Sequence, residues 1–516
     1  MNVLVLGGEG LSWADAARAA LDPSTRLRAD RAAMRAVAAS RAVIDRAVAE
    51  KRPVYGVNTG FGKLQGTAIA AADLAKLQRN LVLSHACGVG DPFSAAETRL
   101  MVLLRIQSLL RGHSGVTTAL VERLVAIWNA GVVPVVPQQG SVGASGDLAP
   151  LAHVALTVIG EGDATWRGRR MASAKALRGA GVAPRYTLRE KEGIGLLNGT
   201  QAMTAVGILA LARAENLLRH ADLAAAMTLD ALCFSVRPFD ARIHVARPHP
   251  GQSVTARNVR GLLRGSAILA SHAKPHGKVQ DPYSVRCAPQ VHGACRDAFA
   301  HVRDVLEREA NSTTDNPLVF ADDGDVVSGG NFHGEPVAMA CDYLTIAAAE
   351  IASISERRVE TLVNPDLSGL PPFLAKRPGA ESGLMIAQVA AAALVSENKS
   401  LAHPASVDSI PTSANQEDHV SMGPIAARKA RDVVRNAERV LAIELLCAAE
   451  ALEHRRPLRS GPGVEAAHAV IRKRVKRLTG DRYLGKDLAA MDELLASGAL
   501  VAAAESAGTG IVGLAG

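Results

Sequence analysis

The sequence predicts a mainly α-helical protein built around a bundle of long helices. Of its 516 residues, 48% are apolar, 21% are charged and only 3% are aromatic. Alanine, leucine and valine dominate and fall in long stretches with helical periodicity, which is typical of a globular, mostly helical protein. With so few aromatic side chains, aliphatic side chains on closely packed helices must fill the core. The length exceeds that of one ordinary domain and allows a large core.

The first elements are predicted to be helices separated by glycine-rich loops. The opening stretch NVLVLGGEG suggests a dinucleotide-binding turn, but Trp13 stands where the third glycine belongs, so we reject this motif. Ser12 is predicted to cap the first helix. We expect alanine-rich helices over 14–50, a long and mobile surface loop over 54–66, helices from 71, a loop at 84–93 and helix again over 97–131.

The later part of the chain is predicted to consist of long helices joined by a few loops. A long apolar helix follows NGTQ at 198–201, and a proline-rich irregular connection is expected over 237–252. Beyond residue 335, long helices alternate with a loop at 403–423. We therefore divide the chain into residues 1–200 and 201–516, with a soft boundary because helices this long usually pack as one bundle.

The formal net charge of +8 does not indicate a nucleic-acid partner. The densest basic run, IRKRVKRL at 471–478, alternates basic and aliphatic residues as one solvated helix face would. No aromatic residue interleaves this run, so we expect no nucleic-acid site. The longest nearly uncharged apolar run, at 383–395, is too short to span a bilayer and contains Gln388, so we expect no membrane segment.

Cysteine and histidine usage predicts neither a metal site nor a disulfide scaffold. None of the six cysteines forms a CxxC pair. The start MNVLVLGGEG lacks the basic region and long apolar core of a signal peptide, so we expect a reducing, cytoplasmic location. His333 and Glu335 lie close together, but no HExxH or HxH spacing accompanies them, and we expect no catalytic metal.

The stretch GSVGASGDLAPLAHVAL, from Gly140 to Leu156, changes abruptly from small residues to an apolar helix. Asp147 stands where an N-cap belongs, and Pro150 falls in the first turn, where proline is tolerated. Ser145 therefore lies just before a helix N-terminus, whose N–H groups and dipole stabilise negative charge. An isolated Ala-Ser-Gly tripeptide is most often an ordinary tight turn, so the surrounding residues must decide its meaning.

The run GSVGASGDLAPLAH resembles the signature of the histidine and aromatic amino acid ammonia-lyases. In that family an Ala-Ser-Gly backbone cyclises to 4-methylidene-imidazol-5-one (MIO), an electrophile made without an added cofactor. The resemblance implies that Ala144, Ser145 and Gly146 form this group, with attack of the glycine nitrogen on the alanine carbonyl and loss of two waters. An electrophile is needed because a β-proton is barely acidic and an amine is a poor leaving group. The family also implies a long-helix fold of the fumarase/aspartase-like type and a homotetramer whose active sites draw on three chains.

The resemblance extends from about residue 53 to 425 and supplies further site residues. VYGVNTGFG carries Tyr55, on what resembles the family's flexible loop. LLNGTQ carries Asn198, which matches a residue that binds the electrophile or the substrate, or which could cap the following helix. SGGNFHGEP carries Phe332, which would shape the pocket near the electrophile.

The segment VQDPYSVRCAPQ carries three more candidates from the resemblance. Gln280 is expected to contact the substrate. Arg286 fits a carboxylate clamp, because a guanidinium fork matches a carboxylate bidentately. Tyr283 fits a general base with a pKa lowered by positive surroundings, and Tyr55 is its competitor for that role.

Two places in the resemblance indicate the substrate. LVLSHACGVG carries Ser84 and His85 where the family contacts the substrate ring, and this pair resembles histidine lyases. TSANQEDHVSMG carries Glu417, which could accept an imidazole N–H but would be left unpaired by a phenyl ring. The resemblance therefore implies elimination of ammonia from L-histidine to give trans-urocanate, the first step of histidine degradation.

Departures from the family pattern leave alternatives open. Where the usual pattern is RCQPQVMGA, this chain has Ala288 and His292, and we interpret His292 as a satisfied core histidine rather than a substrate contact. A tyrosine or other aromatic ammonia-lyase is one alternative, because a phenol could donate to Glu417. An aminomutase that uses the same electrophile is a second. A helical scaffold that binds an anionic partner through its basic surface is the third.

Overall fold

The computed structural model describes residues 2–8, 10–60, 66, 69–272 and 279–514. The chain forms two compact units. The predicted boundary at 200 lies close to the first change of unit, but the assignment of everything beyond it to one domain needs correction, because the chain returns to the first unit twice. The first unit comprises Met1–Leu209, Arg303–Asp342 and Pro404–Arg428, and the second comprises Ala210–Val302, Tyr343–His403 and Lys429–Gly516.

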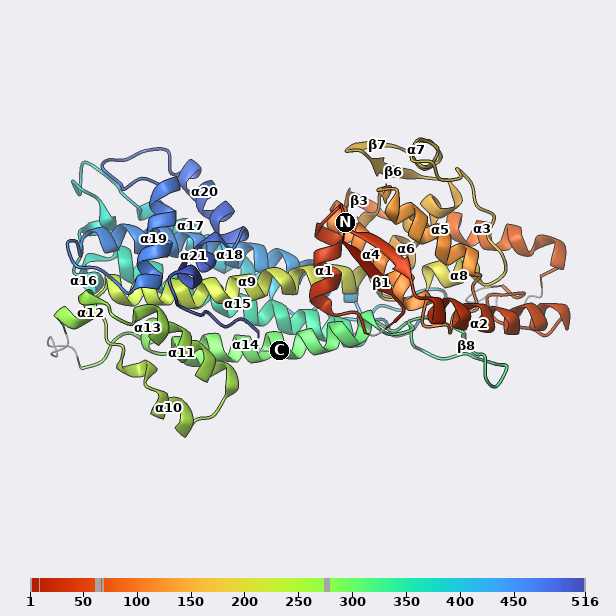
Figure 1. The fold of residues 1–516 in the computed structure, drawn as a ribbon, viewed down its shortest axis with the longest axis horizontal. Coiled ribbons are helices and arrows are strands. Elements are labelled where there is room, and N and C mark those ends of the chain that lie inside the picture. The colour runs from red at the N-terminus through yellow and green to blue at the C-terminus, as the bar shows by residue number, and fades with distance from the viewer. Residues whose placement is uncertain (1, 9, 61–65, 67–68, 273–278, 515–516) are drawn as a thin grey trace. The chain divides into compact units, whose positions relative to one another are not determined.

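The first unit combines helices with small sheets (Figure 1). Its strands are β1 (Val3–Leu6) parallel to β2 (Arg26–Ala29), and antiparallel sets β3 (Val89–Pro92) with β5 (Pro137–Gln139), β4 (Val133–Pro134) with β6 (Asp163–Trp166) and β7 (Arg169–Ala172), and β8 (Leu318–Phe320) with β9 (Asp325–Val327). Its helices are α1 (Trp13–Leu21), α2 (Arg31–Ala49), η2 (Ala71–Asp73), α3 (Leu74–His85), α4 (Ala95–Leu109), α5 (Thr118–Asn129), α6 (Leu148–Ile159), α7 (Ser173–Gly179) and α8 (Glu192–Leu197).

Most of the helices and the helix cap that the sequence predicted for the first unit are confirmed. Ser12 caps α1 as predicted, because its side chain accepts the N–H of Asp15. The helical stretches predicted over 14–50 and 97–131 are present, but β2 interrupts the first and a turn over 110–117 interrupts the second. A strand of four residues is too short for its alternating pattern to be distinguished, in the sequence, from the helices on either side of it.

The second unit is almost entirely helical. Its shorter helices are η3 (Arg237–Phe239), α10 (Ala241–Ala246), α11 (Pro250–Leu263), α12 (Ala267–Ser271), α13 (Tyr283–Arg286), α16 (Pro365–Ser368), η4 (Pro372–Leu374), α17 (Met385–Leu401), α19 (Pro462–Arg474), α20 (Leu484–Ala496) and α21 (Ala499–Ser506). The irregular connection predicted over 237–252 is wrong, since Asp240 caps α10 and Pro250 begins α11. The single solvated face predicted over 471–478 is also wrong: α19 ends at Arg474 and Val475 is buried.

Long helices form the largest elements and confirm the mainly α prediction. They are α9 (Gln201–Ala231), α14 (Ala288–Ala310), α15 (Glu335–Val363) and α18 (Gly423–Glu453). Within the described ranges, α15 is the one helix long and apolar enough to cross a membrane, and 67% of its most apolar window is buried inside the protein. Such burial is typical of a core helix.

Candidate active site

A cavity of about 1020 Å³ in the first unit brings together most of the residues that the sequence indicated. Its walls come from α3, the turn before α6, the loop before α9, and the segments 316–333 and 413–419. The predicted site residues that line it are Tyr55, His85, Ala144, Ser145, Asn198, Phe332 and Glu417.

The tripeptide Ala144–Gly146 forms a tight turn directly before α6. The N–H of Gly146 donates to the carbonyl of Gly143 at 3.2 Å, and Ser145 has a left-handed φ of +50°. Gly146, at φ +79°, lies so close to Gly199 that a Cβ would meet the Gly199 oxygen at 2.2 Å. Only glycine fits at this position without moving the neighbouring backbone.

Asp147 caps a different helix from the one that the sequence predicted. Its side chain makes no capping hydrogen bond to α6. Instead, its Oδ2 accepts the N–H of Ala202 at 2.8 Å and that of Met203 at 2.9 Å, in the first turn of α9. Burial raises the pKa of Asp147 to about 7, although these two N–H groups act in the opposite direction. The turn before α6 is thereby tied to the N-terminus of the long helix.

Asn198 contacts the tripeptide rather than capping α9. Its Nδ2 donates to the carbonyl of Ser145 at 2.8 Å, and its Oδ1 has no hydrogen-bond partner within the described part of the chain. Arg105 on α4 anchors this loop. Its Nη1 donates to the carbonyl of Asn198 at 2.6 Å and to Oε1 of Gln201 at 3.0 Å. Burial lowers the pKa of Arg105 to about 10. Arg105 was not among the residues predicted from the sequence, although a lone arginine inside the apolar run LMVLLRIQSLL was a signal.

Glu417 faces the tripeptide from the loop that precedes α18. The hydroxyl of Ser145 donates to its Oε1 at 3.0 Å, and the hydroxyl of Thr412 donates to its Oε2 at 2.8 Å. The backbones of Thr412 and Glu417 also pair in both directions, which closes the tip of this loop. Three successive residues in the tip, Ser413, Ala414 and Asn415, have positive φ angles. The loop is therefore held in an uncommon conformation that presents the carboxylate to Ser145.

His85 lies at the C-terminal end of α3 and is kept neutral by its surroundings. Burial lowers its pKa, and this effect is only partly opposed by the carbonyl of Leu81 and the charge of Glu417. Its Nδ1 lies 2.9 Å from the carbonyl of Leu81, which can only accept, so Nδ1 carries the proton. The Nε2 of the neutral ring is then a hydrogen-bond acceptor.

Tyr55 and Phe332 are half-buried in the same cavity. The first part of the predicted surface loop is better anchored than expected, because Val54 and Val57 are buried in a cluster with Ile44. Residues 61–65 and 67–68 of that predicted loop lie outside the described residues.

Gln280, Tyr283 and Arg286 belong to the second unit and do not line this cavity. Tyr283 and Gln280 are exposed, and the guanidinium of Arg286 lies 4.4 Å from the centre of the Tyr283 ring. The Nε of Arg286 also donates to the carbonyl of Asp281 at 3.0 Å.

Within the ranges described, no group of three or more His, Cys, Asp or Glu residues could hold a metal ion. His333 accepts the N–H of Glu335 at its Nδ1, at 3.4 Å.

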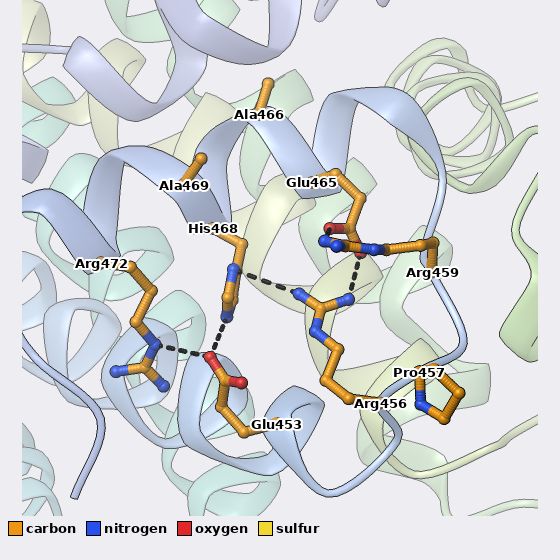
Figure 2. A pocket seen from close by; sticks show the side chains of 9 residues that line it. All are labelled: Glu453, Arg456, Pro457, Arg459, Glu465, Ala466, His468, Ala469 and Arg472. Carbon is orange, nitrogen blue, oxygen red and sulfur yellow. Dashed lines mark hydrogen bonds and ion pairs between the residues drawn. The ribbon is translucent and has the colours of Figure 1, made fainter.

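A second cavity, of about 660 Å³, lies in the second unit and is lined by alternating charges (Figure 2). Arg456 pairs with Glu465 at 2.7 Å, and Glu453 lies 3.0 Å from both His468 and Arg472. Because Arg456 and Arg472 already face carboxylates of the same cavity, we interpret this cluster as a structural network of ion pairs and hydrogen bonds.

Comparisons with known proteins give consistent relatives. The family described as aromatic amino acid lyase matches residues 11–473. Histidine ammonia-lyase from Symbiobacterium thermophilum is 56% identical over 490 residues, which cover 95% of this chain and 94% of that protein. Among solved structures, histidine ammonia-lyase from Trypanosoma cruzi is 43% identical with a TM-score of 0.91, covering 98% of this chain and 96% of that one. Tyrosine aminomutase from Streptomyces globisporus is 36% identical with a TM-score of 0.93, covering 100% of both chains.

Proposed function

This chain belongs to the aromatic amino acid lyase family and is a carbon–nitrogen lyase, and we propose that it eliminates ammonia from L-histidine to give trans-urocanate. In that reaction the bond from Cα to nitrogen breaks, a proton leaves Cβ, and a double bond forms between the two carbons. The observation that carries the proposal is the polar wall of the cavity beside Ser145, where Glu417 and His85 both line the space.

We infer that Ala144, Ser145 and Gly146 cyclise to MIO. The tight turn, the positive φ of Ser145 and the absence of room for a Cβ at Gly146 support closure between the carbonyl carbon of Ala144 and the nitrogen of Gly146. Asn198 donates to the carbonyl of Ser145, which is the carbonyl that such a ring retains. This hydrogen bond withdraws electron density from the ring. When formed, the group supplies the electrophile that the elimination needs.

An imidazole substrate offers a ring N–H to the two acceptors beside the tripeptide, one acceptor for a neutral ring and both for an imidazolium. The Nε2 of neutral His85 can accept a substrate N–H. The Oε1 of Glu417 accepts the hydroxyl of Ser145, and loss of that hydroxyl as water would release this oxygen for an imidazole N–H. A phenyl ring offers no donor, and leaving the carboxylate unpaired would cost about 1–3 kcal/mol.

The base and the carboxylate clamp are proposed to come from more than one subunit. Tyr55 lines the cavity within its own chain, whereas Gln280, Tyr283 and Arg286 belong to the second unit and would reach the cavity of a neighbouring copy. We propose a homotetramer with shared active sites. In support, Met339, Tyr343 and Ile346 of α15 expose an apolar stripe at helical spacing.

The proposal is tested by following near-UV absorbance of the purified enzyme with L-histidine, L-tyrosine and L-phenylalanine in separate reactions. We expect a urocanate band with histidine only, and no band in the variant Ser145→Ala. Mass spectrometry of the wild-type peptide around residue 145 should show the loss of two waters. Turnover of tyrosine alone would reject histidine as the substrate, and no turnover with an uncyclised tripeptide would reject the reaction class.

A second candidate is an aminomutase, because the tyrosine aminomutase structure is as similar in fold as the lyase structure. An aminomutase would return the ammonia to Cβ, so a β-amino acid among the products would identify it. A cytoplasmic location remains a prediction that cell fractionation would test.

A further inference from the structure

A buried polar network in the second unit surrounds His292, one of the two residues interpreted from the sequence as departures from the family pattern. His292, Asp222, Arg358 and Glu444 are all buried, with side chains 0% exposed. The Nδ1 of His292 lies 2.9 Å from Oδ1 of Asp222, and its Nε2 lies 3.3 Å from Nη1 of Arg358. The sequence interpretation of a satisfied core histidine is therefore confirmed.

The hydrogen bonds determine which ring nitrogen carries the proton. A guanidinium can only donate, so Nε2 of His292 accepts from Arg358. The proton then lies on Nδ1 and is donated to Asp222. Burial lowers the pKa of His292, and Arg358 lowers it further. A neutral imidazole thus joins two buried ion pairs, one between Asp222 and Arg296 and one between Glu444 and Arg358.

This network reaches the segment that carries the proposed clamp and base. Nη1 of Arg358, the same atom that donates to His292, also donates to the carbonyl of Ser284 at 3.3 Å. Ser284 lies between Tyr283 and Arg286 in the four-residue helix α13. Glu444 holds the other side of the guanidinium, with Oε1 2.6 Å from Nε and Oε2 2.8 Å from Nη2. Because the guanidinium is a rigid plane, Glu444 and His292 together set the direction in which Nη1 points toward the Ser284 carbonyl.

We propose that His292 is a positioning residue for the lyase reaction: by accepting from Nη1 of Arg358, it orients the guanidinium that holds the Ser284 carbonyl and so fixes Tyr283 and Arg286. The proposal rests on the proposed function, because it concerns the two residues assigned to the base and the clamp. A short helix has few hydrogen bonds of its own and depends on such outside contacts for a defined position. Small displacements of binding groups are known to lower rates strongly.

The test compares His292→Met with His292→Gln. Methionine removes both hydrogen bonds, whereas glutamine can donate to Asp222 through its amide N–H and accept from Arg358 through its oxygen. We expect the KM for L-histidine to rise about tenfold in His292→Met, because Arg286 is displaced, and to stay near the wild-type value in His292→Gln. A variant that merely loses folded protein would lower the apparent kcat and leave KM unchanged.

His220→Met is the matched control. His220 is also buried in the second unit, and its Nδ1 contacts the carbonyl of Asn216. Losing this imidazole should leave KM unchanged. If His292→Met does not fold, His292→Asn replaces it, because the shorter amide cannot reach both partners.

Hydrogen exchange of the amides of Val285, Arg286 and Cys287 supplies a readout that does not need turnover. We expect faster exchange at these amides in His292→Met and wild-type exchange in His292→Gln and His220→Met. Unchanged KM and unchanged exchange in His292→Met would overturn the proposal, as would a His292→Gln variant that behaves like His292→Met. A wild-type enzyme inactive on histidine would instead reject the proposed function, and the exchange result would still decide the role of His292.

Discussion

At the scale of single residues, hydrogen-bond partners distinguish side chains that the sequence pattern treats alike. Glu417 and Asp147 are both carboxylates within reach of the tripeptide turn. Glu417 accepts from side-chain hydroxyls beside the cavity, whereas Asp147 is fully buried and accepts from backbone N–H groups. We therefore expect substitutions at Glu417 to change catalysis and substitutions at Asp147 to change stability.

Glu417→Gln should lower kcat/KM for L-histidine by about 10- to 100-fold, the loss expected when a charged hydrogen-bond acceptor becomes neutral. Steady-state kinetics with histidine would measure this change. Thr412→Val is the control, because it removes only the donor to Oε2 and should have a smaller effect. An unchanged kcat/KM in Glu417→Gln would show that the carboxylate does not hold the substrate.

His85 should make the protein less stable at acidic pH. Its pKa is lower in the folded protein than its ordinary value of 6.5, chiefly because of burial, so the unfolded chain binds more protons. The contribution of His85 to the free energy of unfolding is fully present above pH 6.5 and is lost as the pH falls below that value. Thermal denaturation from pH 7.5 down to about pH 5 should therefore show a steeper loss for the wild type than for His85→Gln. Parallel curves for the two proteins would contradict this prediction.

At the scale of elements, the N-terminus of α9 is completed by a residue that directly precedes another helix, α6. Asp147 supplies the acceptor for two N–H groups of the first turn. Because α9 begins at Gln201, three positions after Asn198, this contact also keeps the Asn198 side chain close to the carbonyl of Ser145. The same capping interaction therefore supports both the long helix and the tripeptide turn.

Asp147→Ala should lower the free energy of unfolding by about 1–3 kcal/mol, because two buried helix N–H groups lose their acceptor. Asp147→Asn keeps an acceptor oxygen and should lose less. The pKa of Asp147 is raised to about 7, so the folded protein holds its proton between about pH 4 and 7, and the wild type should lose stability relative to Asp147→Asn as pH rises through this range. Chemical denaturation at several pH values would measure both effects, and equal stability of all three proteins would exclude the capping role.

At the scale of the whole molecule, the distribution of site residues between two units makes assembly part of the proposed mechanism. The tripeptide proposed to form the electrophile and the proposed ring contacts belong to the first unit, and Tyr283 and Arg286 belong to the second. The cavity in the first unit is therefore lined by the proposed ring contacts, His85 and Glu417, but not by the proposed clamp, Arg286.

Co-expression of Ser145→Ala with Tyr283→Phe should restore activity that neither variant has alone. If each active site combines Ser145 of one subunit with Tyr283 of another, random mixing leaves about a quarter of the sites intact. Activity of the separately purified variants and of the co-expressed mixture would be compared at equal protein concentration. No recovery in the mixture would show that both residues act within one chain. If Tyr283→Phe is active alone, Tyr55 rather than Tyr283 is the base.

The sequence by itself determined the helical class, the long helices and the segments that carry the candidate site, because helical periodicity and short motifs depend on neighbouring residues. Only the tertiary structure decided the contacts between those segments. Ser145 contacts Glu417, which lies 272 positions away in the sequence, and Asn198, which lies 53 positions away. Asp147 accepts from the first turn of α9 rather than from α6, the helix that directly follows it. Arg105 and His292 likewise took their roles from packing. Such hydrogen bonds depend on how helices pack in three dimensions, and no local pattern encodes that arrangement.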